Sequence, residues 1–185
     1  MPLELAALDH DLDEWLRLLP PAGKRELAAL VRACGGDASV VDAPRLSISP
    51  SPPAAPAGSG SLILDEETLT ALAMQVGARF AVSGEVRQAA LRASVREAGH
   101  LAEDTFEAPA ALVYALARNR SVFAAFAPMV VAAAFMQARA SGLALAAPPK
   151  AIADIADAVT ASDMRYEDVR AFFASETFPL GRVDG

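Results

Sequence analysis

The sequence predicts an all-α fold, and three of its features carry that prediction. Alanine dominates an apolar content of 54%, and alanine loses no side-chain entropy on entering a helix. Apolar residues recur at three- and four-residue steps along most of the chain, which is the period of a helix with one buried face. Helix stop signals separate these stretches at Pro20-Pro21, Gly35-Gly36 and Gly142.

Composition divides the 185 residues into an N-terminal helical pair, a linker, a larger helical domain and a tail. The boundaries that we predict are 1–36 for the pair, 37–61 for the linker, 62–178 for the domain and 179–185 for the tail. The linker is rich in proline, alanine, serine and glycine, which favours a flexible tether. Its Val40 and Val41 could still dock on a neighbouring surface as an extended piece.

The larger domain is expected to hold about six helices. The acidic run Asp65-Glu66-Glu67 favours a helix start, because negative charge is stabilised at the positive end of a helix. The predicted helices cover about residues 66–81, 85–99, 108–119, 124–141, 150–161 and 162–175.

One segment of this domain carries a family resemblance. Ala110–Arg118 (AALVYALAR) and Asn119 are followed by a loop and by the alanine-rich stretch that ends at Phe135. This arrangement resembles the helix, signature loop and helix of the Fic/Doc family, whose loop commonly reads His-Pro-Phe-x-x-Gly-Asn-x-Arg. The likeness extends over about residues 62–175 and implies a Fic/Doc-like helical bundle.

The residues that carry chemistry in that family are replaced in this chain. The position of the motif histidine, a general base, holds Arg120, whose guanidinium stays protonated and cannot accept a proton. Ala124 stands where the family has a carboxylate that holds Mg²⁺. Ala125 and Phe126 replace the glycine and asparagine of the anion-binding turn, and Pro128 replaces the arginine that grips phosphate. The resemblance therefore implies a scaffold without its active site, and Phe126 is expected to plug the former cleft.

Elsewhere the sequence offers no other catalytic centre, cofactor motif or metal site. The acidic run around His10 (Asp9, Asp11, Asp13 and Glu14) is interpreted as a solvated helix face, because a metal site needs three or four converging ligands. Arg118 and Arg120 would lie at the mouth of the former cleft. They would contact an anion or an acidic partner there, or form ordinary salt bridges with Glu85, Glu97 or Glu103.

We therefore expect a non-catalytic interaction or regulatory protein that binds another macromolecule and needs no cofactor. The N-terminal pair is the expected partner-binding or dimerising arm, because two short amphipathic helices must dock on their own domain, on a second copy or on a partner. The residues expected to form that face are Leu5, Leu8, Leu12, Trp15, Leu27 and Leu30.

Two alternatives remain open at this stage. The first is a nucleic-acid-binding regulator that uses the N-terminal pair or the arginines Arg87, Arg92 and Arg96, although a net charge of −7 argues against it. The second is a divergent Fic/Doc transferase that moves AMP or phosphate. The single cysteine, Cys34, fits a reducing cytosol, and the most apolar run is shorter than the roughly 20 residues that a bilayer requires.

Overall fold

A computed structural model of the chain describes residues 5–42, 62–82, 86–119 and 126–180. Within these residues the protein is helical apart from one small sheet, so the predicted all-α class is confirmed. The helices are α1 (Leu5–Leu18), α2 (Pro21–Ala33), α3 (Ser39–Asp42), α4 (Glu66–Phe80), α5 (Gln88–Leu101), α6 (Ala108–Arg118), α7 (Phe126–Ala140), α8 (Pro149–Thr160) and α9 (Tyr166–Glu176).

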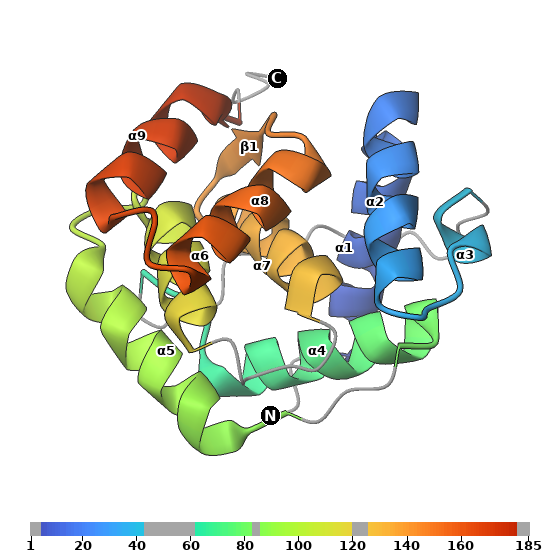
Figure 1. The fold of residues 1–185 in the computed structure, drawn as a ribbon, viewed down its shortest axis with the longest axis horizontal. Helices are drawn as coiled ribbons and strands as arrows, with labels where there is room; N and C mark the ends of the chain where they lie inside the picture. The colour runs from blue at the N-terminus through green and yellow to red at the C-terminus, as the bar shows by residue number, and fades with distance from the viewer. Residues whose placement is uncertain (1–4, 43–61, 83–85, 120–125, 181–185) are drawn as a thin grey trace.

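Helices α6 and α7 form the centre of the molecule, and the other helices surround them (Figure 1). Both are alanine-rich and buried on nearly every face. Small side chains let helix backbones approach closely, and α6 and α7 also contact other helices on their remaining faces. Helix α5 packs along α6, and α4 lies against α7. Helix α8 contacts both α6 and α7.

The start of α4 follows the sequence prediction. The Asp65 carboxylate accepts a hydrogen bond of 2.8 Å from the backbone N–H of Thr68, and Glu66 and Glu67 occupy the first turn. The last helix starts later than expected, at Tyr166, because Ser162 adopts a left-handed conformation with φ of 64° that interrupts the chain before it.

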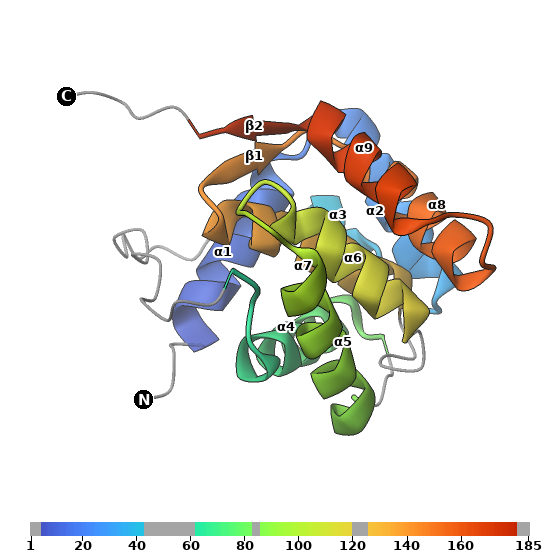
Figure 2. The ribbon, with the colours of Figure 1, turned by 90° about the vertical axis from the view of Figure 1, so that its left-hand side faces the viewer.

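A two-stranded antiparallel sheet was not predicted. Strand β1 (Leu143–Leu145) pairs with β2 (Thr177–Pro179), with Ala144 opposite Phe178. Gly142, at φ of 72°, turns the chain from the end of α7 into β1. The sheet lies beside α9 at one edge of the molecule (Figure 2).

The first residues of the predicted linker belong to the folded structure. Ala38 and Val41 are buried, and residues 39–42 form the short helix α3 rather than an extended piece. The backbone N–H of Asp37 donates to the carbonyl of Phe80 at 2.6 Å, which fixes this segment to the end of α4. The rest of the predicted linker, residues 43–61, lies outside the described residues.

The N-terminal helices pack on the larger domain and share one hydrophobic core with it. Helix α1 lies against α4 and α7, whereas α2 lies against α3, α7 and α8. The Glu26 carboxylate of α2 accepts a hydrogen bond of 3.1 Å from the backbone N–H of Lys150, in the first turn of α8. The sequence left three docking surfaces open for this pair: its own domain, a second copy or a partner. In the described structure the pair docks on its own domain.

Candidate functional site

The candidate site suggested by the sequence is the junction between α6 and α7. Three of its positions, Arg120, Ala124 and Ala125, lie outside the described residues. Phe126 and Pro128 are described, and both side chains are buried in the first turn of α7. Proline is tolerated there because the first backbone N–H groups of a helix have no partner within it.

The side chains of Phe126 and Pro128 have no donor, acceptor or charge to offer a ligand. Phe126 is only 5% exposed to solvent, and its ring belongs to the core that the helices enclose.

The carbonyls at the C-terminal end of α6 are bound by side chains from three sources. Asn119 Nδ2 donates to the carbonyl of Ala115 at 2.9 Å. The hydroxyl of Ser94 in α5 is shared between the carbonyls of Ala90 and Ala115, at 3.0 and 3.3 Å. The hydroxyl of Thr160 in α8 is likewise shared between the carbonyls of Ala156 and Ala117, at 2.8 and 3.1 Å. Because a helix leaves its last carbonyls without internal partners, these bonds fasten α5 and α8 to the end of α6.

Arg118 forms a salt bridge on the surface of this junction. Its guanidinium lies 2.5 Å from the carboxylate of Glu97 in α5 and 5.8 Å from the ring centre of Tyr114. Asn119 Nδ2 also approaches the Glu97 carboxylate, at 3.4 Å. The sequence left Arg118 either a contact with an anion or acidic partner, or an ordinary salt bridge. In the described structure Arg118 forms the salt bridge, with Glu97. Such exposed pairs contribute only about 0–1 kcal/mol.

Tyr114, which lies beside the guanidinium of Arg118, also contacts a second tyrosine. Tyr114 of α6 meets Tyr166 of α9 edge-on, with ring centroids 5.5 Å apart. The hydroxyl of Tyr166 donates to the carbonyl of Leu101 at 3.3 Å. Burial, followed by the nearby negative charge of Glu107, raises the pKa of Tyr166 to about 12. The phenol therefore stays neutral near pH 7 and serves as a hydrogen-bond donor.

The predicted partner face of the N-terminal pair is largely internal. Leu12, Trp15 and Leu27 are buried, and Leu8 and Leu30 are partly buried against the same core. The side chain of Leu5 lies outside the described part. These residues therefore pack inside the chain, because their apolar stripes meet α4, α7 and α8.

The acidic run of α1 is also paired rather than only solvated. Asp13 forms a buried salt bridge with Arg79 of α4. Asp11 and Glu14 lie 3.5 and 2.6 Å from Arg139 of α7. Burial raises the pKa of Asp11 above its ordinary value, although Arg139 acts in the opposite direction. The spacing of the acidic residues identified their helix face but not the two arginines opposite them.

The three arginines considered for nucleic-acid binding, Arg87, Arg92 and Arg96, differ in their surroundings. Arg92 makes a two-point salt bridge with Glu66, at 2.9 and 3.2 Å, and Arg87 and Arg96 are exposed. The Glu66 carboxylate is thus committed to Arg92, and this hydrogen bond lowers the pKa of Glu66.

Metal-ligating clusters and membrane-spanning helices are both absent from the described residues. No group of three or more histidine, cysteine, aspartate or glutamate side chains is placed there to hold a metal ion. None of the described helices has both the length and the apolar character needed to cross a membrane. Scans against protein-family models, curated proteins and solved structures each gave no significant match.

Proposed function

We propose that this chain is a non-catalytic interaction protein, built on a helical scaffold that resembles the Fic/Doc domain without its active site. The observation that carries the proposal is the state of Phe126 and Pro128. They stand where the resemblance implies an asparagine and a phosphate-binding arginine, and both are apolar side chains buried in the first turn of α7.

Transfer of a nucleotidyl or phosphoryl group needs positive charge or a metal ion around the phosphates, because charge on the transferred group must be stabilised. A buried phenylalanine and a buried proline supply neither. On the neighbouring side of the junction, the charge of Arg118 is already balanced by Glu97. These contacts favour a binding role over the divergent transferase.

The helical packing supports the same proposal. The α6–α7 pair fixes the relative positions of the surrounding helices, and several large apolar side chains remain exposed on the described surface. These are Leu18, Leu62, Met74, Phe106, Phe178 and Leu180. They come from different elements, so the scaffold presents apolar side chains to partners without a need for chemistry at the centre.

Two measurements on the intact protein test the proposal. Calorimetric titration with ATP and Mg²⁺ at millimolar concentration is expected to give no binding heat. Incubation with ATP labelled on the α or γ phosphate is expected to transfer no label to the protein or to added proteins. Saturable nucleotide binding together with label transfer would contradict the proposal and support the transferase.

A further inference from the structure

Helix α1 is attached to the molecule along one surface, which is formed by α4 and α7. We call this the α1-docking surface and define it by Arg79 of α4 and by Phe135 and Arg139 of α7. The ring of Trp15 lies on that of Phe135, with centroids 5.1 Å apart. Leu12 and Leu16 are fully buried on the same side of α1.

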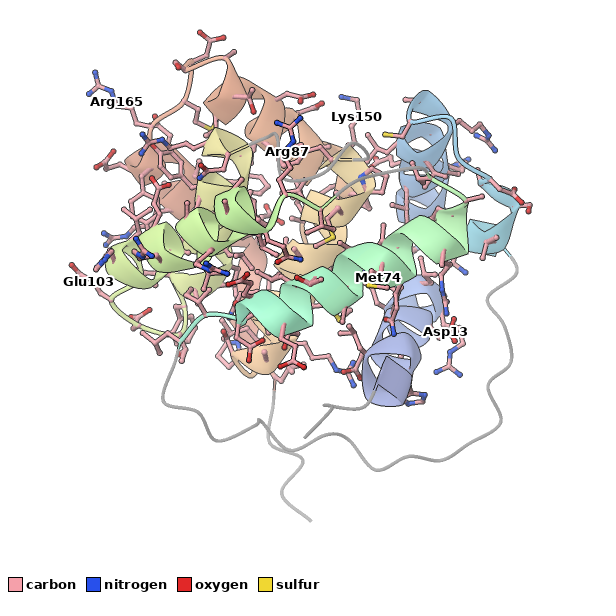
Figure 3. The ribbon with its side chains drawn as sticks, turned by 90° about the horizontal axis from the view of Figure 1, so that it is seen from below. Asp13, Met74, Arg87, Glu103, Lys150 and Arg165 are labelled. Carbon is pink, nitrogen blue, oxygen red and sulfur yellow. The ribbon has the colours of Figure 1, made fainter. Side chains whose placement is uncertain are left out.

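The charges across this contact are complementary. Every acid of the contact, Asp11, Asp13 and Glu14, comes from α1, and the two arginines come from the α1-docking surface. Figure 3 places Asp13 on α1 next to α4. The side chains of Arg79 and Asp13 are only 7% and 8% exposed, so α1 supplies a carboxylate to a buried cation of this surface.

The fit of α1 to this surface is incomplete. Within the described residues, Asp13 Oδ2 and Trp15 Nε1 are buried and have no hydrogen-bond partner. Both atoms would be hydrated if α1 were released, so docking carries a penalty that release removes. Helix α1 also joins α2 through Pro20 and Pro21, and its principal contacts are with α4 and α7. The contacts of α2 with α3, α7 and α8 do not involve α1.

We propose that the α1-docking surface is a helix-binding site, which α1 fills within the chain and which accepts an acidic amphipathic helix of a partner protein in its place. The partner helix would present two carboxylates three residues apart to Arg139, as Asp11 and Glu14 do. It would also carry one carboxylate for Arg79 and an aromatic ring for Phe135. This inference rests on the proposed function as an interaction protein.

The test uses the full chain and a capped synthetic peptide of residues 5–19 as the probe. In the chain variant Asp13→Lys, a cation faces Arg79, so its own α1 is released while the docking surface is unchanged. Calorimetry is expected to show saturable binding of the peptide to this variant. Binding to the unmodified chain should be at least about tenfold weaker, because its site is already occupied.

Reversed charges provide the matched control. A peptide carrying Asp13→Lys should fail on the Asp13→Lys chain and bind the Arg79→Glu chain. The double variant Asp13→Lys/Arg79→Glu restores the ion pair within the chain and should again resist both peptides. Peptide binding that does not depend on opposite charges at positions 13 and 79 overturns the proposal. So does absence of binding to a variant that keeps its helical circular dichroism. That outcome involves no nucleotide, so it leaves the proposed function to be judged by its own assay.

A measurement on the unmodified protein covers the case in which the variants do not fold. Amide hydrogen exchange should show α1 opening before the rest of the chain, with protection at least about tenfold lower than in α6 and α7. Equal protection in α1 and α7 would mean that α1 opens only on global unfolding, and it would overturn the proposal as well.

Discussion

The side-chain amide of Gln137 binds the backbone on both sides of Ile63, and the hydrogen bond to Leu64 is the shorter of the two. Gln137 Oε1 accepts from the Leu64 N–H at 2.8 Å, and its Nε2 donates to the Leu62 carbonyl at 2.9 Å. Gln137 is 1% exposed and lies within the apolar helix α7. It thus fixes the segment before α4 to the central helix.

Replacing Gln137 with leucine should therefore destabilise the protein. The change leaves a backbone donor and a backbone acceptor without the Gln137 partner, at about 1–3 kcal/mol each. We expect the free energy of unfolding in urea to fall by about 2–6 kcal/mol. The exposed Gln88→Leu is the matched control, and a similar loss in both variants would contradict this role of Gln137.

Gly36 marks a close approach of two segments. A Cβ at this position would lie 2.6 Å from the Phe80 carbonyl oxygen and 2.8 Å from a methyl group of Val31. Gly36→Ala is expected to lower the free energy of unfolding by about 1–3 kcal/mol, because the α2–α3 turn must move away from the end of α4.

The control for Gly36 is Gly99, an exposed residue within α5 that has open space around its would-be Cβ. Gly99→Ala should leave stability unchanged or raise it by up to about 1 kcal/mol, since alanine is the better helix former. Denaturant curves that show the same shift for both variants would refute the proposed contact.

Burial of the Phe126 ring should be visible in stability. Phe126→Ala removes a buried ring at the start of α7 and should cost about 3–5 kcal/mol. Phe106 is 49% exposed, and Phe106→Ala should cost clearly less. Thermal unfolding followed by circular dichroism compares the two, and an unchanged midpoint for Phe126→Ala would argue against a filled junction.

Tyr166 should make stability depend on alkaline pH. Its pKa rises to about 12 in the folded chain from an ordinary value of 10.0. Above pH 10 the unfolded chain loses this proton while the folded chain keeps it, so stability falls as the pH rises from 10 to 12. Tyr166→Phe should remove this part of the decline.

Absorbance titration checks the same residue directly. The chain has two tyrosines, so the variant Tyr114→Phe leaves Tyr166 as the only phenol. Its ionisation should appear near pH 12 in the folded protein and near pH 10 in denaturant. A single transition near pH 10 in both conditions would show that the folded environment does not protect this phenol.

The sequence was sufficient to predict the longer helices, because their apolar period and their stop signals are local. It could not predict β1 and β2. These strands are short, and their pairing joins residues far apart in the chain, so no alternating pattern marks them. Helix α3 escaped notice because a single turn has no period of its own.

The candidate site was less accessible to sequence reasoning. The periodic leucines of α1 and α2 identify an apolar stripe but not the surface that it meets, so an internal contact looked like a partner face. The arginines opposite the acids of α1 were missed for the same reason. Arg79 lies in an otherwise uncharged part of α4, which is the kind of position where an isolated charge indicates a buried partner.

The contact between Trp15 and Phe135 also determines what spectroscopy of this protein would measure. Trp15 is the only tryptophan in the chain, and its indole is buried in the seam between α1 and α7. Intrinsic fluorescence therefore reports the position of one helix, whereas circular dichroism averages over all of them. A fluorescence change that precedes the loss of helical signal would record the departure of α1, so the two signals should not be combined into one melting curve.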